Sequence, residues 1–336
     1  MYVNADSNVN SDIADVVENV MPSVVSITNT SVQAVENFFF GTQQIPSESR
    51  GSGVILGQNE KELLIVTNHH VVKDSTTLTV TFMDDTSIEA QIKGMDAKRD
   101  LAIVSIRLEQ IPSETMSAIK VATMGSSDNL RVGETTIVIG NALGYGQSVT
   151  TGIISALGRE LEDYEGALIQ TDAAINQGNS GGALLNANGE LIGINSAKLY
   201  GDTVESMGYA IPISDVKDIL DDLMNREIRE KVAEGKRGSL GIRGATVDET
   251  YASVYNMPQG VFVSQVIEGG AAEKVGLPTN CIITELEGVT ILSMEELIAE
   301  LEYYEVGETV TLLIQTPDRN GYVEEKIEIT LYKMAD

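Results

Sequence analysis

A glycine-rich turn around a single serine is the part of the sequence best suited to carry chemistry. Residues 177–182 read Gln-Gly-Asn-Ser-Gly-Gly, so three glycines surround Ser180 within five residues. Glycines permit a tight turn that presents a hydroxyl and directs successive backbone N–H groups at one point. An oxyanion hole requires donors fixed in this way, each worth about 3–4 kcal/mol of transition-state stabilisation. On its own, such a run is also typical of a surface turn.

A serine hydroxyl becomes a nucleophile when a base removes its proton and a third group orients that base. The chain has two histidines, His69 and His70, which follow the apolar run Leu-Leu-Ile-Val. A zinc site at this pair is disfavoured, because neighbours on a strand point to opposite faces and no His-Glu-x-x-His spacing occurs. Asp100 opens the apolar run 101–104 and is the candidate orienting carboxylate. The chain order His, Asp, Ser is that of chymotrypsin and differs from that of subtilisin and the α/β-hydrolases.

Short β-rich segments separated by Gly and Asn/Asp turns must position these residues. No helical pattern of 10–15 residues lies between the segments, so residues 23–212 predict an antiparallel sandwich or a pair of barrels and not βαβ units. The clearest local signal is a hairpin with Asn188-Gly189 at its turn. The expected strands are 23–28, 51–56, 62–68, 77–82, 100–106, 135–140, 166–171, 182–186 and 190–195.

The pattern changes after residue 212. Ser214-Asp215 resembles a helix N-cap, and apolar residues recur at helical spacing to Leu223 before a charged linker that ends near Gly238. The last hundred residues combine short strands with a helix over 294–304 and predict a small α+β module. The sequence therefore predicts an N-terminal arm and helix (1–22), a β-rich domain (23–212), a helix and linker (213–238) and a C-terminal domain (239–336).

Composition excludes several classes of function. Of 336 residues, 50 are acidic and 22 are basic, which gives a net charge of −28. A surface this acidic repels polyanions, so nucleic acid is excluded as the main partner. Cys281 is the single cysteine, which excludes an internal disulfide and a cysteine-based zinc cluster. No apolar run approaches the roughly 18 residues that cross a bilayer, and the first residues lack the pattern of a signal peptide.

Nine successive blocks of the sequence resemble the HtrA/DegP serine proteases and their C-terminal PDZ domain. The resemblance implies a mainly β fold, with a chymotrypsin-like double β-barrel protease domain followed by a small α+β PDZ domain. It implies that Ser180 is the nucleophile, His70 the base and Asp100 the residue that orients the imidazole. The N–H groups of Gly178 and Ser180, with that of Asn179, would form the oxyanion hole, and no metal or organic cofactor is required. The blocks are TNHHVV, DAKRDLAIV, GYGQSVTTGIISALGR, IQTDAAINQGNSGGALL, LIGIN, MGYAIP, RGSLGIRG, GVFVSQVIEGGAAEKVGL and SMEELIAEL.

The resemblance also indicates where peptides would bind. Ala174, six residues before Ser180, would lie at the base of the primary specificity pocket, and its lack of charge disfavours cleavage after basic residues. With Ile175 beside it, we predict cleavage after small apolar residues such as valine or alanine. The segment Asn195-Ser196-Ala197-Lys198 is expected to form the pocket wall and to pair with the substrate as an added strand.

In the PDZ domain, backbone amides around Leu240, Gly241 and Ile242 would hold the terminal carboxylate of a bound peptide, beside an apolar slot along the helix 294–304. Eight glutamates and no basic residue lie between Glu285 and Glu308. This stretch predicts a preference for peptide tails with lysine or arginine upstream of an apolar terminus.

The implied partners are unfolded or misfolded proteins and C-terminal peptides, in protein quality control outside the cytoplasm of a bacterium. We expect a cell-surface or periplasmic protein whose membrane anchor lies outside this chain. Family members form trimers or larger assemblies, and the apolar run Phe38-Phe39-Phe40 predicts a contact between subunits. The alternative, from another class, is a non-catalytic holdase chaperone or peptide-binding adaptor on the same fold. The presence of His70, Asp100 and Ser180 favours the enzyme.

Overall fold

The chain divides into two compact units, Met1–Arg226 and Glu227–Asp336. The computed structural model describes residues 13–37, 41–141, 146–161, 164–197, 207–227, 229, 231–319 and 321–333. The division falls between Arg226 and Glu227, inside the segment 213–238. Among the described residues, no helix has both the length and the apolar character needed to span a bilayer.

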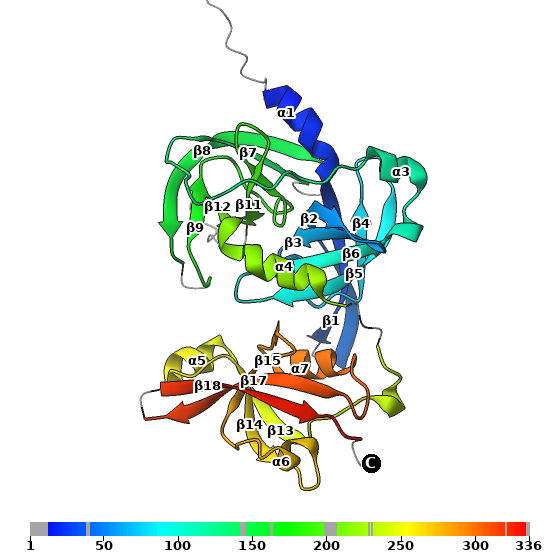
Figure 1. Ribbon diagram of the computed structural model, residues 1–336, viewed down its shortest axis with the longest axis vertical. Helices are drawn as coiled ribbons and strands as arrows, with labels where there is room; N and C mark the ends of the chain where they lie inside the picture. Colours follow the sequence, from blue (N-terminus) through cyan, green and yellow to red (C-terminus); the bar gives the residue numbers. More distant parts are fainter. Residues whose placement is uncertain are drawn as a thin grey trace, which may run out of the picture. The chain divides into compact units, whose positions relative to one another are not determined.

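In the described part of the first unit, two closed antiparallel barrels of six strands each carry the fold, in blue to cyan and in green (Figure 1). The first barrel has the strand order β1-β2-β3-β6-β5-β4, and the second has the order β10-β11-β12-β9-β8-β7. The strands of the first are β1 (Val24–Asn37), β2 (Gly41–Gln58), β3 (Glu62–Thr67), β4 (Thr77–Thr81), β5 (Ser87–Asp96) and β6 (Leu101–Arg107). Those of the second are β7 (Thr135–Gly140), β8 (Ser148–Arg159), β9 (Leu168–Thr171), β10 (Ala183–Leu185), β11 (Leu191–Ser196) and β12 (Gly208–Pro212).

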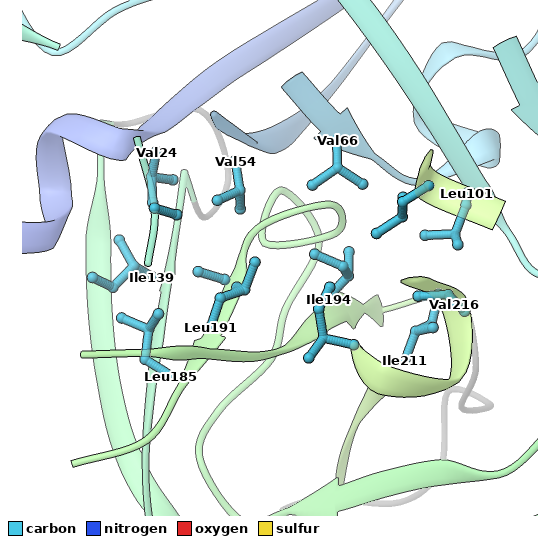
Figure 2. Packing of buried hydrophobic residues seen from close by; sticks show 14 of the residues in the cluster. Val24, Val54, Val66, Leu101, Ile139, Leu185, Leu191, Ile194, Ile211 and Val216 are labelled. Carbon is cyan, nitrogen blue, oxygen red and sulfur yellow. The ribbon is translucent and has the colours of Figure 1, made fainter. Parts of the chain in front are cut away.

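The apolar runs of β3 and β6 are continuous because both faces of these strands are buried. Successive side chains point to opposite faces, so Ile65 packs inside the first barrel while Val66 packs toward the second. Val66 belongs to a cluster that joins the two barrels, in which Val24, Val54 and Leu101 meet Ile139, Leu191 and Ile194 (Figure 2). His70 follows β3 and Asp100 precedes β6, while Ser180 precedes β10. The three candidate residues are therefore carried to this junction from both barrels.

The helices of the first unit are short, and two of them pack against the barrels. Helix α1 (Ile13–Val20) buries Val16 and Val20 against the hairpin turn at Gly189, whose missing Cβ would lie 3.0 Å from each. Helices α2 (His69–Val72) and α3 (Ser113–Ala118) are short connections. Helix α4 (Lys217–Asn225) packs against β5 and β6.

The start of the 213–238 segment corrects one expectation from the sequence. A 3₁₀ turn over Ser214–Val216 precedes α4. The Ser214 hydroxyl accepts a hydrogen bond from the Ser127 N–H at 2.9 Å and does not cap the helix. The Ser214 side chain, which the sequence predicted to be an N-cap, therefore binds a loop 87 residues earlier in the chain.

In the second unit, an antiparallel sheet is covered by short helices. The sheet has the order β13-β14-β15-β17-β18, with β16 paired to β15, so β13 is an edge strand. The prediction of a mainly β chain with double-barrel and PDZ-like parts is confirmed. The elements are β13 (Ile242–Val247), α5 (Glu249–Tyr255), β14 (Gly260–Val266), α6 (Ala271–Lys274), β15 (Ile282–Leu286), β16 (Val289–Thr290), α7 (Met294–Leu301), β17 (Thr309–Asp318) and β18 (Gly321–Thr330).

Candidate active site

The two adjacent histidines lie in a short helix and not on a strand. Strand β3 ends at Thr67, and His69–Val72 forms α2. The Asn29 amide ties this helix to β1 by donating to the carbonyls of Val71 and Lys73 at 3.0 and 2.9 Å. His69 is buried, whereas the His70 side chain is 24% exposed and faces Asp100. The helix therefore separates the two imidazoles, and His70 is the one that meets the carboxylate.

Asp100 is held in a backbone conformation that aims its carboxylate at His70. Its φ is +50°, in the left-handed region that costs a non-glycine residue about 1–3 kcal/mol. The Asn68 side-chain amide fixes this turn by donating to the Asp100 carbonyl at 2.9 Å. The carboxylate lies 2.8 and 2.9 Å from His70 Nδ1 and also accepts the His70 backbone N–H at 3.1 Å. Both the ring and the main chain of His70 are therefore oriented by one carboxylate.

Ser196 contacts the His70–Asp100 pair in a way that the sequence did not reveal. Its buried hydroxyl donates to Asp100 Oδ2 at 3.1 Å across the junction between the barrels. Asn195, equally buried, donates its amide to the Ala183 carbonyl at 2.8 Å. Both side chains are committed to internal hydrogen bonds, so the backbone of this segment is what a substrate strand would pair with, and the pocket wall predicted for residues 195–198 stays a prediction. Lys198 lies outside the described residues.

The serine turn presents two unused backbone donors. Gly178 has φ +96°, a conformation that favours glycine. Among the described residues, the N–H groups of Gly178 and Ser180 have no hydrogen-bond acceptor. The Asn179 N–H donates to the Asn176 carbonyl at 2.9 Å and is occupied. This corrects the expectation that Asn179 contributes to an oxyanion hole and leaves Gly178 and Ser180 as its candidates.

The Ser180 hydroxyl rests against the neighbouring strand end. Its oxygen accepts the Ala197 N–H at 3.0 Å. Within the described residues it makes no hydrogen bond to His70. The structure thus brings the three candidate residues to one junction with the His70–Asp100 pair formed and the serine hydroxyl turned to Ala197.

The residues predicted for the specificity pocket lie on both sides of the second barrel wall. Ala174 is exposed, and its carbonyl accepts the Thr150 hydroxyl at 2.9 Å. Ile175 is buried in the barrel core beside Gly208. A Cβ at Gly208 would come within 2.9 Å of the Ile175 side chain, so this glycine leaves the room that Ile175 occupies.

A second candidate site lies at the edge of the PDZ-like sheet. Gly241 has φ +74°, and a Cβ there would lie 2.8 Å from the Tyr332 ring. Its N–H donates to the Ser239 hydroxyl at a long 3.3 Å, while the Leu240 carbonyl accepts the Ala272 N–H at 2.8 Å. Leu240 is buried in the core, so its side chain is not available to a ligand.

Helix α7 lies beside the edge strand β13. Its first residue, Met294, donates its N–H to the Thr246 hydroxyl at 3.1 Å. Ile298 on this helix is an apolar side chain that is 58% exposed, and among the described strands β13 pairs with β14 alone. An unpaired edge beside an apolar helix face is the arrangement in which an extended peptide can add as a strand.

Basic residues of the preceding segment neutralise part of the acidic stretch. Glu302 pairs with Lys231 at 2.7 Å and with Arg237 at 2.6 Å, and Arg229 pairs with Glu308 at 2.6 Å. The hydrogen bond from Lys231 is the main cause that holds the pKa of Glu302 below its ordinary value. These glutamates are therefore used within the unit, which reduces the charge left for a bound peptide.

Metal ligands and reactive thiols do not gather in the described part of the chain. Within it, no group of three or more His, Cys, Asp or Glu side chains could hold a metal ion. Burial raises the pKa of Cys281 to about 11, so its thiol is not a nucleophile near neutral pH.

Comparison with known proteins points to one family. Residues 51–194 match a trypsin-like peptidase domain, and residues 230–315 match a PDZ domain. The chain is 36% identical to the serine protease Do-like HtrA of Bacillus subtilis, over 93% of this chain and 71% of that protein. It is 38% identical to the periplasmic serine endoprotease DegP of Escherichia coli, over 89% and 69%. A solved HtrA-type protease, AlgW with a decapeptide, superposes with a TM-score of 0.52 at 28% identity, over 96% of this chain and all of that one.

Proposed function

Because this chain belongs to the HtrA/DegP family of serine endoproteases, we propose that Ser180, His70 and Asp100 form its catalytic triad and that its substrates are unfolded proteins. The observation that carries the triad is the Asp100 carboxylate, which lies 2.8 Å from His70 Nδ1 at the junction where Ser180 is presented. The other histidine of the chain, His69, is buried.

Peptide hydrolysis would proceed through an acyl-enzyme. Nδ1–H of His70 donates to Asp100, so the other ring nitrogen carries the lone pair that takes the proton from the Ser180 hydroxyl. The serine oxygen attacks the peptide carbonyl, and the same imidazole then protonates the leaving amine. Water repeats the sequence on the ester and releases the acid. Asp100 and the Ser196 hydroxyl keep the imidazole in the required tautomer and position.

The oxyanion of the tetrahedral intermediate would be bound by the N–H groups of Gly178 and Ser180. Both point from a turn fixed at Asn179 and Gly182, whose hydrogen bonds measure 2.9 Å. Donors that are fixed before the reaction do not have to reorganise as negative charge develops on the oxygen.

One contact supports the second candidate, a binding protein on the same fold. The Ser180 hydroxyl accepts from Ala197 and makes no hydrogen bond to His70 among the described residues. In the enzyme the hydroxyl turns to His70 when substrate binds. In a holdase chaperone or peptide-binding adaptor it would stay with Ala197, and chemistry would not follow.

The PDZ domain would capture C-terminal peptides by adding them to β13. The Gly241 N–H would donate to the terminal carboxylate of the peptide instead of making its long hydrogen bond to the Ser239 hydroxyl. The exposed Ile298 side chain would contact the last side chain of the peptide. Glu295, at the start of α7, accepts a hydrogen bond from the Thr246 hydroxyl of this strand at 3.5 Å. A preference for basic tails would therefore rest on Glu295 and be weaker than the count of glutamates predicts.

Location and assembly follow from the family. The relatives DegP and DegQ are named periplasmic, and we propose that this protein too works outside the cytoplasm, in protein quality control. A homotrimer, or a larger assembly, stays a prediction, since Phe38, Phe39 and Phe40 lie outside the described residues. A membrane anchor outside this chain is likewise a prediction.

An unfolded substrate separates the two candidates. Casein is incubated with the wild type and with Ser180→Ala, and new peptide termini are counted by mass spectrometry. The protease predicts termini with the wild type only, enriched after small apolar residues. Equal disappearance of casein with both chains and no new termini would leave the binding protein.

A further inference from the structure

Ser52 of β2 lies at the centre of a hydrogen-bond node against the serine turn. It is fully buried. Its N–H donates to the Ser180 carbonyl at 2.8 Å, and its hydroxyl donates to the Gly178 carbonyl at 2.7 Å. One residue of the first barrel therefore binds the turn of the second barrel on both sides of Asn179.

The remaining polar groups of Ser52 are also used. The Asn141 N–H, at the end of β7, donates to the Ser52 hydroxyl oxygen at 2.8 Å. The Thr67 hydroxyl donates to the Ser52 carbonyl at 2.7 Å. A Cβ at Gly140 would lie 3.0 Å from the Ser52 hydroxyl and one at Gly182 would lie 3.2 Å from its Cβ, so the node is closely packed. A side chain this enclosed has its hydroxyl orientation fixed by its partners.

The hydroxyl matters because Gly178 has no side chain to restrict its rotation. Its φ of +96° is one of many conformations open to glycine. The peptide after it is held at both ends, the carbonyl by Ser52 at 2.7 Å and the N–H by Asn176 at 2.9 Å. Rotation about the Gly178 Cα–C bond would break the first bond and move the Gly178 N–H relative to the rest of the turn. Among the described residues, Ser52 is the partner recorded for the Gly178 carbonyl.

We propose that Ser52 is a positioning residue of the oxyanion hole, whose hydroxyl locks the Gly178 backbone so that its N–H stays aimed at the reacting carbonyl oxygen. The proposal rests on the proposed protease function and adds a residue 126 positions away from Gly178 in the sequence. Ser52 itself touches neither the substrate nor the proton that moves.

Ser52→Ala tests the proposal in the full chain with a chromogenic peptide. Removal of an oxyanion-hole donor lowers kcat by about 10²–10³. Removal of the Ser52 hydrogen bond, which only restrains such a donor, should lower kcat about 10–100-fold, or roughly 1.4–2.8 kcal/mol. KM should change less than about threefold, because the hole acts on the transition state. In the Ser180→Ala background, Ser52→Ala should leave the Kd of the uncleaved peptide unchanged.

Thr67→Val is the matched control, since it removes a hydrogen bond of the same length from the carbonyl side of Ser52 and spares Gly178. Thr67→Val should lower the unfolding temperature, as Ser52→Ala does, but its kcat should stay within about threefold of the wild-type value. The downfield proton signal of His70, assigned in a chain with two histidines, should be unchanged in both variants. If Ser52→Ala does not fold, Ser52→Cys, which hydrogen-bonds more weakly, should still lower kcat about fivefold or more.

Three results would overturn the proposal. They are a Ser52 variant that folds with kcat within threefold of the wild type, an equal loss of kcat in Thr67→Val, and a loss confined to KM. Failure of the proposed function looks different, because the wild type would then show no hydrolysis that depends on Ser180.

Discussion

Replacing Asp100 by asparagine should nearly abolish catalysis while leaving the fold intact. Asparagine has the same shape but presents an NH₂ group where the carboxylate lies 2.8 Å from His70 Nδ1. The amide would donate to that nitrogen, so the ring proton would move to the other nitrogen, and His70 could no longer accept the proton from Ser180.

The size of the loss follows from the geometry of the pair. When His70 takes a proton, its positive charge faces the Asp100 carboxylate, which lies 2.8 Å from Nδ1 and whose side chain is 7% exposed. For unit charges we take a separation of about 4 Å, because the charge of each group is spread over several atoms. At an effective dielectric of about 20, two such charges attract by about 4 kcal/mol. Loss of that term corresponds to about a thousandfold in rate, and the wrong tautomer increases it, so we expect kcat to fall by about 10³–10⁴.

The assay is steady-state cleavage of a chromogenic peptide, with circular dichroism to check folding. Asp96→Asn is the matched control, because Asp96 lies in the same turn and its carboxylate accepts the Arg99 N–H at 2.9 Å without contacting His70. It should keep kcat within about threefold of the wild type. The reasoning is refuted if a folded Asp100→Asn chain retains a tenth of the activity, or if Asp96→Asn loses as much.

Other predictions address the supporting residues and the second unit. Ser196→Ala removes one of the bonds to Asp100 and should lower kcat about 3–10-fold with little change in KM; unchanged kinetics would remove Ser196 from the site. Ile298→Asp should weaken binding of an apolar C-terminal peptide at least tenfold by calorimetry, and an unchanged Kd would place the peptide elsewhere. Since Lys231 lowers the pKa of Glu302, this pair stabilises the fold above the ordinary glutamate pKa of 4.5 and loses that contribution as pH falls through the lower folded value. Glu302→Gln, made in an inactive parent chain, should therefore unfold at a lower temperature than the parent at pH 7. The two unfolding temperatures should become equal at a pH low enough to protonate Glu302 in the folded parent. A difference in unfolding temperature that is the same at every pH would contradict the pairing. Incubation with EDTA should leave the rate of peptide cleavage unchanged. A loss of activity in EDTA that added zinc restores would instead support a zinc site at His69 and His70.

Local patterns in the sequence predicted much of the fold. The strand Thr135–Gly140 has the bounds expected for it, and the strands Glu62–Thr67 and Leu101–Arg107 agree within one residue at each end. Strands β5 (Ser87–Asp96) and β8 (Ser148–Arg159) were missed, because the first alternates with charged residues and the second is rich in Thr, Ser and Gly. Both are completed by pairing with partners along the barrel, a contribution that a single segment does not display.

The candidate site was predictable in its residue types and not in its supporting contacts. Asp100, Ser180 and one histidine of the pair 69–70 follow from chemistry and chain order. The choice of His70 followed from the family resemblance, and in the structure His70 is the histidine that pairs with Asp100. The bonds from Ser196 to Asp100 and from Ser52 to Gly178 span 96 and 126 residues. Contacts at such separations depend on how the two barrels close against each other, which no single segment of the sequence displays.

The most direct test of the central claim is to identify the residue that becomes acylated. The wild type is treated with a peptide phosphonate ester, which reacts only with an activated serine, and the modified residue is mapped by mass spectrometry. The account predicts one adduct, on Ser180, that is absent in Ser180→Ala and forms at least a hundredfold more slowly in His70→Ala. Hydrolysis of peptides without an adduct on Ser180, or an adduct that forms as fast without His70, would contradict it.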